Sequence, residues 1–530
     1  MKTRSTLPSP RRERRRRRTQ RATTRVATLV LWGALCAVGA SACGNTAKAG
    51  SAGSQSKGDL TIGINGPPVN LNPAKDGINY ASIVRTLADA TITHVNSDGT
   101  IGPGLALSFR YVDADHRIFQ FTLRSDARFS DGSPVTPAAV KAWLEYYLHV
   151  GGPAVGDIGQ VRSISTLGTR TVEIQMVKPN PILPRMLSEL YTWGQVQGPK
   201  ALANPAILAT NTDGAGPYKL DPGASVTGDH YTFVPNPYYY SHSVVRYSQI
   251  TVKVITDPSS MLAAVRTGEV NVAMGDPSTA AAASSAGFSV ISAPDAWSGL
   301  LLTNRASGPL AKLAVRQALN YAINRDQITQ ALVQKYGTPS SEVATPDAIN
   351  PQYVNYYAYD PSKARALLTQ AGYSHGFTLK VSEGTFFGFA GTPLTQAIAQ
   401  NFQAIGVRLD ITSEPTLGGL GKDLFSGTYP AFVAYYSFQP MWFFYADTLA
   451  PKALWNTGHA DEPTLDALYQ QAAASNSLKL WQQMSALTVT QADFVPVVES
   501  DQIYYIGKGV GGVNISPGDP YPIPSQWTPQ

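Results

Sequence analysis

The stretch Val315-Arg-Gln-Ala-Leu-Asn-Tyr-Ala-Ile-Asn-Arg325 predicts a helix within a chain of 530 residues. Val315, Leu319 and Ala322 recur at three- and four-residue spacing and therefore share one face of that helix. Arg316 and Arg325 lie off this face. We expect the stretch to pack its apolar face on a core and to act as scaffold rather than as a ligand contact.

Strands and helices are intermixed along the rest of the chain. Residues 59–65, 169–176 and 249–255 alternate polar and apolar side chains, as half-buried strands do. Helix starts are marked at Thr136-Pro137 and at Asp360-Pro361, where a capping side chain precedes a proline in the first turn. This pattern favours an α/β protein over a sandwich or a bundle. A body of roughly 470 residues exceeds one hydrophobic core, so we expect at least two lobes.

A series of short motifs sharpens this interpretation. They lie at residues 105–106, 119–124, 129–132, 134–140, 214–218, 236–239, 265–270, 315–325, 359–368 and 371–373. In this order, and over roughly residues 59–515, the chain resembles the extracellular solute-binding proteins of family 5. That family serves oligopeptide, dipeptide and nickel importers driven by ATP.

The resemblance implies a specific architecture and specific partners. The fold would be the two-lobed type II fold of the large periplasmic binding proteins, with an extra N-terminal subdomain and a ligand enclosed at the hinge. The partners would be a small-molecule or peptide ligand and the permease and ATPase subunits of an importer, with the protein itself a monomer. The predicted boundaries are a signal peptide at 1–42, a lipidated flexible tether at 43–58, lobe 1 at 59–85 with 195–280 and 500–530, an extra subdomain at 86–194 packed on lobe 1, and lobe 2 at 281–499.

The N-terminus has the parts of an export signal. The first 42 residues hold eleven Lys and Arg and one acid, and an apolar run at 26–42 precedes Cys43. Ala40-Ser41-Ala42-Cys43 resembles a bacterial lipobox, in which Cys43 is the lipid attachment site. We therefore expect an extracytoplasmic protein anchored to the cell membrane by lipid. The alternatives are an ordinary secreted protein and an uncleaved membrane anchor.

Composition excludes two classes of function. Without residues 1–42 the chain has 31 Lys and Arg against 35 Asp and Glu, so the body is mildly acidic and has no electrostatic footprint for nucleic acid. Cys36 and Cys43 are the only cysteines; the first would leave with the signal peptide and the second would carry lipid. The body therefore has neither a disulfide nor thiol chemistry.

Catalytic motifs are absent from the sequence of the body. It has no His-Glu-x-x-His, no cysteine pair, no Gly-x-Ser-x-Gly and no phosphate loop. We predict neither catalytic residues nor a metal site nor a cofactor, and the chain is not expected to be an enzyme. A transport fold reused as a regulatory or docking module remains an alternative of another class.

The resemblance also shows where a ligand would bind. In the peptide-binding branch an Asp shortly before an x-Pro pair holds the peptide amine, but here that position falls on Tyr436 and residues 433–440 hold no carboxylate. Dipeptide binders place an Arg in the loop that corresponds to residues 383–391, and here this loop has none. Aromatic residues replace the charged clamp. The predicted ligand-binding residues are Trp297, Phe387, Tyr435, Tyr436, Phe438 and Trp442.

Two classes of ligand stay open at this stage. A buried ammonium or carboxylate without a partner costs several kcal/mol, so a zwitterionic dipeptide would fit poorly. An oligopeptide or peptide-like solute is the family's commonest ligand and is our first prediction. The alternative is an uncharged ligand such as a glycoside, a modified peptide or a siderophore-like molecule, since aromatic faces stack on sugar rings and apolar groups.

The lipobox gives the first testable prediction. Cys43→Ala removes the thiol that would be acylated, so the protein should move from the membrane fraction into the medium or periplasm. Fractionation followed by immunoblotting checks this, with Cys36→Ala as the control that keeps the wild-type distribution. A Cys43→Ala protein that stays on the membrane after signal cleavage contradicts the lipobox.

Overall fold

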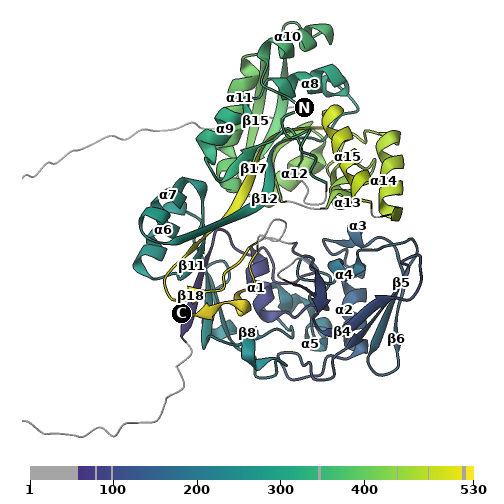
Figure 1. The fold of residues 1–530 in the computed structure, drawn as a ribbon, viewed down its shortest axis with the longest axis vertical. Coiled ribbons are helices and arrows are strands. Elements are labelled where there is room, and N and C mark those ends of the chain that lie inside the picture. The colour runs from purple at the N-terminus through teal and green to yellow at the C-terminus, as the bar shows by residue number, and fades with distance from the viewer. Residues whose placement is uncertain are drawn as a thin grey trace, which may run out of the picture. The chain divides into compact units, whose positions relative to one another are not determined.

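An 11-stranded sheet organises the computed structural model (Figure 1). The structure describes residues 58–77, 80–96, 100–343, 348–437, 440–475, 477–515 and 521–530, without the side chain of Ala474. The predicted signal peptide, Cys43 and Phe438 lie outside the described residues. The strand order is β15-β14-β16-β12-β17-β11-β1-β10-β9-β8, and β13 also pairs with β17. The strands are β1 (Asp59–Ile64), β8 (Tyr218–Leu220), β9 (His230–Pro235), β10 (Gln249–Val254), β11 (Val272–Met274), β12 (Ser289–Leu302), β13 (Gly337–Pro339), β14 (Phe377–Gly384), β15 (Val407–Glu414), β16 (Ala431–Ser437) and β17 (Phe494–Ile506).

Two long strands join the halves of this sheet. β12 and β17 are antiparallel neighbours from Ser289 opposite Ile506 to Leu301 opposite Phe494. One end of β17 also pairs with β11, whereas the other end of β12 pairs with β16. Figure 1 shows both strands running from the part that contains β11 to the part that contains β15. The pairing of β12 with β17 shifts register between Pro294 and Ala296 and again between Ser298 and Gly299.

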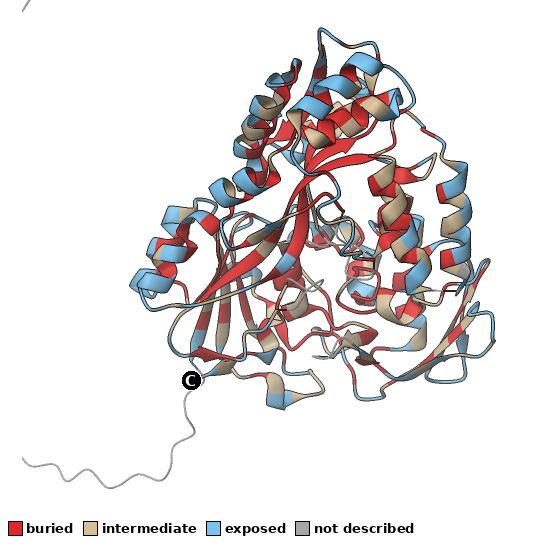
Figure 2. Ribbon diagram, turned by 45° about the horizontal axis from the view of Figure 1, so that its top comes forward, coloured by how far each residue is buried: buried red, intermediate tan, exposed pale blue. Residues whose placement is uncertain are grey.

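Helices cover each half of the sheet with their apolar faces. In Figure 2 the strands are largely buried, and the outer helices expose their solvent-facing sides. One core forms between the first half of the sheet and α1, and a smaller one forms around α6. A third core lies under α8, α10 and α11. The helices are α1 (Ala81–Ala88), α6 (Pro258–Thr267), α7 (Pro277–Ser285), α8 (Leu313–Tyr321), α9 (Arg325–Leu332), α10 (Pro361–Gln370), α11 (Thr392–Gln403) and α12 (Leu417–Ser426).

A second sheet of four strands belongs to residues 106–176, in the order β4-β5-β7-β6. Its core continues through α2 into the helices that follow β16, so Trp143 and Trp442 belong to one apolar cluster. The elements are β4 (Ala106–Tyr111), β5 (Ile118–Leu123), β6 (Val161–Leu167), β7 (Thr171–Met176), α2 (Pro137–His149), α3 (Val155–Ile158), α4 (Leu183–Met186), α5 (Pro199–Ala203), α13 (Met441–Phe444), the π-helix η6 (Tyr445–Leu449), α14 (Pro463–Ser475) and α15 (Leu478–Thr490). Two short ribbons, β2 (Thr93–Val95) with β3 (Ile101–Pro103) and β18 (Val510–Gly511) with β19 (Thr528–Pro529), complete the strands described.

The helix boundaries that were predicted from capping residues are confirmed. The Thr136 hydroxyl accepts a hydrogen bond of 3.2 Å from the Ala139 amide at the start of α2. The Asp360 carboxylate accepts one of 2.8 Å from Lys363 at the start of α10. Gly372, just beyond α10, has a φ of +85°, which a residue with a side chain rarely adopts.

Both arginines of the opening motif are scaffold, as predicted. Arg325 is buried and donates to the carbonyl oxygens of Ser340, Pro496, Asn320 and Tyr357. In this way its guanidinium ties α9 to the start of β17 and to the loops between them. The fork of five donors suits this task, because one guanidinium can reach several carbonyl oxygens at once.

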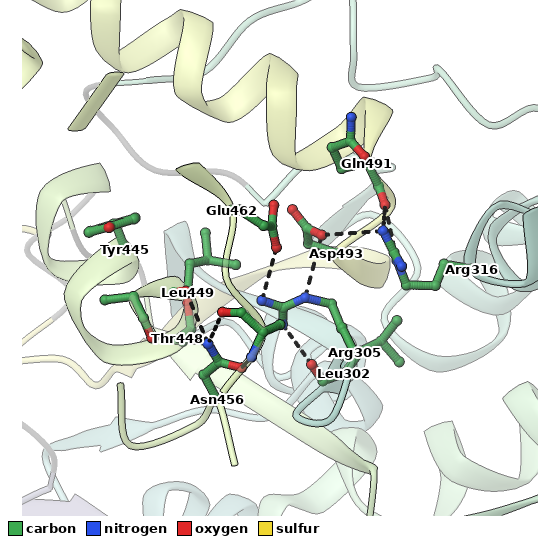
Figure 3. Close-up of polar contacts among 12 residues, drawn as sticks. Leu302, Arg305, Arg316, Tyr445, Thr448, Leu449, Asn456, Glu462, Gln491 and Asp493 are labelled. Carbon is green, nitrogen blue, oxygen red and sulfur yellow. Dashed lines mark hydrogen bonds and ion pairs between the residues drawn. The ribbon is translucent and has the colours of Figure 1, made fainter. Parts of the chain in front are cut away.

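A buried polar network closes one end of the long strand pair (Figure 3). Asp493 directly precedes β17, and its carboxylate lies 3.5 Å from Arg305 and 3.9 Å from Arg316. Arg305 follows β12 and also donates to the Leu302 carbonyl at 2.8 Å and to Glu462 at 3.2 Å. Burial raises the pKa of Asp493 to about 7. The network therefore holds the end of β12 against the beginning of β17.

None of the helices in the described part of the chain is long and apolar enough to span a bilayer.

At the second shift in register, the structure predicts that Gly299 cannot be replaced by a larger residue without a loss of stability. A Cβ on Gly299 would lie 2.3 Å from the Val495 carbonyl oxygen of β17, so Gly299→Ala forces the two strands apart. We expect a loss of about 1–3 kcal/mol in the free energy of unfolding, as for other overpacked sites. Chemical unfolding followed by circular dichroism measures it.

Gly421→Ala is the matched control. Gly421 lies inside α12 with open space where its Cβ would be, so alanine should stabilise that helix by up to about 1 kcal/mol. Equal effects of the two substitutions would contradict the close approach at Gly299.

Candidate functional site

Aromatic side chains gather where β12 and β16 pair. Trp297 of β12 lies opposite Tyr436 of β16, and their rings stack with centroids 6.0 Å apart and planes 26° apart. Successive residues of a strand point to opposite faces, so Tyr435 belongs to the other face. There its ring stacks on Phe387, with centroids 6.2 Å apart. The structure thus sorts the predicted ligand-binding residues into two groups rather than one.

The first group joins two distant segments of the chain. Trp297 is 1% exposed, and within the described residues its indole N–H has no hydrogen-bond partner. Trp442 of α13 is also buried and stacks on Tyr191, with centroids 6.4 Å apart. Tyr191 follows α4 and belongs to the apolar core of the four-stranded sheet, so this stack brings residues 106–191 against the helices after β16.

The second group lies between β14 and β16. Phe387 and Tyr435 are partly buried and pack at the edge of the core under α8 and α11. Phe389 meets the Tyr435 ring edge-on at 6.4 Å. Phe386 is more exposed than these and contacts Phe387. Their partial burial leaves ring surface for a ligand, unlike the fully packed rings of the core.

A buried carboxylate accompanies the second group. Asp295 sits in the first register shift of β12, is 1% exposed, and accepts a hydrogen bond of 2.6 Å from the Tyr435 hydroxyl. Its other oxygen, Oδ1, has no partner among the residues that the structure describes. Burial raises the pKa of Asp295 to about 6. The hydrogen bond from Tyr435 acts in the opposite direction and lowers this pKa.

Phenols from the first half of the sheet also approach Asp295. Burial and then the Asp295 charge raise the pKa of Tyr80 and of Tyr521. Tyr80 directly precedes α1, and Tyr521 follows β18. Tyr80 and Tyr521 thus lie close enough to Asp295 to sense its charge, and Tyr435 is the phenol that contacts it.

Two further carboxylates lie near the first group. The Tyr436 hydroxyl donates to Asp447 of η6 at 2.8 Å. Burial and then the Asp447 charge raise the pKa of Asp157, on α3, to about 9. Asp157 and Asp447 therefore lie close enough to repel, although 86–194 and 281–499 were predicted as separate parts of the chain.

Sequence reasoning missed these three carboxylates. It searched residues 433–440 for an acid and found none, but Asp295 and Asp447 reach the hydroxyls of Tyr435 and Tyr436 from other segments. One signal was available, because Asp295 is a lone carboxylate at the start of an otherwise apolar run in β12. Its partner could not be foreseen from the sequence.

Two cavities adjoin the described elements. One, of about 480 Å³, is lined by Arg305, Arg316 and Glu462, whose charges are already engaged around Asp493 (Figure 3). The other, of about 250 Å³, lies between residues 156–160 and 178–182 on one side and Trp442 with α14 and α15 on the other. The second adjoins the first aromatic group and is the better candidate for ligand contact.

The chemistry of these residues is that of binding an organic solute. Aromatic faces offer apolar burial and attract cations, and a buried carboxylate offers an acceptor to an ammonium group. In the described part of the chain, no three His, Cys, Asp or Glu side chains gather as metal ligands.

Comparisons with known proteins agree with a binding role. A sequence model of the middle part of the bacterial extracellular solute-binding proteins, family 5, matches residues 100–451. A Brucella ovis protein, provisionally named an ABC transporter peptide-binding protein, is 26% identical over 368 residues, 68% of each chain. The glutathione-binding protein GsiB of Salmonella typhimurium is 28% identical over 310 residues, 57% of this chain and 59% of its own. A solved periplasmic binding protein of A. tumefaciens with agropinic acid is 22% identical, with a TM-score of 0.77 over 89% of this chain and 99% of its own.

The Asp295 carboxylate predicts a pH-dependent stability difference. Its folded pKa of about 6 lies above its ordinary value of 3.8, so the stability that its protonated form contributes is present below pH 3.8 and lost as the pH rises through 6. Asp295→Asn stays neutral. Its gain in unfolding free energy over wild type should therefore grow by about 2 kcal/mol between pH 4 and pH 7.5.

Denaturant unfolding at the two pH values checks this, with the exposed Asp410→Asn as control. A gain that does not change with pH would mean that Asp295 titrates normally.

Proposed function

The chain belongs to family 5 of the bacterial extracellular solute-binding proteins, and on that premise we propose that its ligand is a peptide or peptide-like solute with a free amine. Its fold is the two-lobed type II fold of the periplasmic binding proteins. It is the substrate-binding protein of an ABC importer, so permease and ATPase subunits are its partners. The predicted lobe boundaries, the monomeric state and the lipid on Cys43 are part of the proposal.

The unpaired Oδ1 of Asp295 carries the proposal of an amine. A buried carboxylate with an unsatisfied oxygen is costly, and the cost falls when an ammonium group donates to that oxygen. Tyr435 fixes the other oxygen at 2.6 Å and so orients the carboxylate. Asp295 would thus replace the acid that the peptide-binding branch carries at the position of Tyr436.

Aromatic side chains would supply most of the remaining contact. We propose that the ligand lies against the partly buried rings of Phe387 and Tyr435, on the face of β16 where Tyr435 contacts Asp295. Trp297, Tyr436 and Trp442, on the other face, stay predicted contacts. Phe438 lies outside the described residues and stays a predicted contact. Apolar burial on such rings is tolerant of side-chain identity, which suits a receptor for variable peptides.

The similar proteins point to amine-bearing ligands. One relative is named for peptide binding and another for glutathione, and peptides and glutathione carry an amine. A ligand held by Asp295 and Tyr435 on one side and by Tyr80 or Tyr521 on the other would contact both halves of the sheet. Such a ligand favours the closed state because it contacts both lobes only there.

An uncharged ligand is the second candidate. Residues 383–391 hold no Arg for a ligand carboxylate, and the rings offer stacking surface for a sugar. A regulatory or docking role without transport is the third, and it requires no small ligand at all. Binding measurements separate the three.

Calorimetry with the tripeptide Ala-Phe-Ala tests the proposal. Wild type should bind the free peptide, and N-acetylation should weaken binding at least thirtyfold, because the blocked amine no longer pairs with Asp295. Asp295→Asn should show the same loss for the free peptide and little further loss on acetylation, whereas Asp410→Asn should bind as wild type does.

Maltotriose serves as the uncharged probe in the same experiment. Equal affinity for free and acetylated peptide, or tight binding of maltotriose alone, contradicts the amine and favours the second candidate. Absence of binding to all three probes, together with an unchanged melting temperature, favours a docking role.

A further inference from the structure

The outer pocket is the cavity of about 250 Å³ walled by residues 156–160 and 178–182 together with Trp442, Tyr469 and Trp481. Its two sides come from different segments, since α3 and residues 178–182 line one side, and α13, α14 and α15 line the other. Figure 1 shows α3 next to α13 and α14. The pocket is therefore closed only when the segment of the four-stranded sheet lies against the helices after β16.

Three aromatic side chains form one wall of the outer pocket. The Trp442 side chain is 7% exposed and stacks on Tyr191, whereas Tyr469 stacks on Tyr445 with centroids 4.2 Å apart. Tyr469 also lies 6.1 Å from Trp481. These contacts fix the rings before a ligand arrives. A wall of fixed rings presents negative faces, and such faces attract ammonium and guanidinium groups.

Asp157 supplies the acid that would pair with such a group, because a cation beside a carboxyl group favours its ionised form. It lines the outer pocket from α3, and Asp447 approaches it from η6. Neither carboxylate forms an ion pair with any residue that the structure describes. Lys178 also lines the outer pocket, but it is exposed. The pocket therefore combines an aromatic wall with an acid that lacks a cation.

We propose that the outer pocket binds an organic cation of the ligand, an ammonium or guanidinium group on an aliphatic stem. The stem would lie against Ile158, Met176 and the Trp442 ring, and its cationic end would reach Asp157. This inference rests on the proposed function, since the cation is a second positive group of the solute whose amine Asp295 receives.

The same cation would favour closure. Asp157 lines the outer pocket, and burial together with the Asp447 charge raises its pKa to about 9, so without a cation its carboxyl group stays protonated at neutral pH. A cation beside Asp157 would stabilise its ionised form and pair with it across the closed pocket. A ligand that carries it gains affinity both from the contact itself and from the easier closure.

A lysine scan of tripeptides tests the inference. Each position of Ala-Phe-Ala is replaced in turn by lysine or by norleucine, which has a similar stem without the charge. At one position lysine should bind at least tenfold more tightly than norleucine to wild type. In Asp157→Asn this preference should fall below threefold, while Asp115→Asn, which changes an exposed acid of the same segment, should keep it.

Two further measurements test the cation pocket independently of peptide affinity. X-ray scattering should show greater compaction with the preferred lysine peptide than with its norleucine counterpart. Indole fluorescence should respond to n-butylammonium in wild type and less in Asp157→Asn. Equal binding of lysine and norleucine peptides, with Asp295 still required, overturns the inference and leaves the proposed function standing.

A failure of the proposed peptide ligand can also be distinguished from a failure of the cation pocket. If no peptide binds but n-butylammonium acts through Asp157, the proposed peptide ligand is wrong and the cation pocket stands. If neither peptides nor n-butylammonium bind, both are wrong. Circular dichroism and the melting temperature of each variant exclude loss of folding as the cause.

Discussion

The antiparallel pairing of β12 with β17 is the constraint on which the rest of the structure depends. These two strands belong to both halves of the main sheet, so every contact between the halves is placed relative to them. The network of Arg305, Arg316 and Asp493 holds one end of the pair, and the close approach at Gly299 sets its spacing. Asp295 and Trp297 precede Gly299 in β12, where the register shifts. Regular pairing at both ends thus holds an irregular segment at the point where a ligand would bind.

The irregular segment lowers the stability of the folded protein. A shift in register frees Asp295 from the simple alternation of a strand and buries its carboxylate with one oxygen unpaired. Burial of Asp295, Asp447 and Asp157 raises the pKa of each, so each lowers the free energy of unfolding at neutral pH relative to acid pH. Residues that oppose stability in this way are common at binding sites, where a ligand relieves the cost.

Local chemistry predicted more of the fold than of the site. Thr136 and Asp360 cap the helices that they were expected to cap, because a cap depends on an amide three residues away. Arg316 and Arg325 proved to be scaffold, although the carbonyls that they bind could not be foreseen from the motif. The aromatic residues of the site were treated as one group. Alternation along β16 instead sends Tyr435 and Tyr436 to opposite faces, with Phe387 on one and Trp297 on the other.

The sequence by itself determined the α/β class, the order of the family's motifs, and the helix and strand boundaries that depend on neighbouring residues. Only the tertiary structure decided which carboxylates lie beside the predicted aromatic residues. Asp295 and Tyr435 are 140 residues apart and meet because β12 and β16 are paired neighbours. Asp157 and Asp447 meet because α3 packs on η6. Spacing along the chain carries no information about such pairs, since their distance is set by the packing of whole elements.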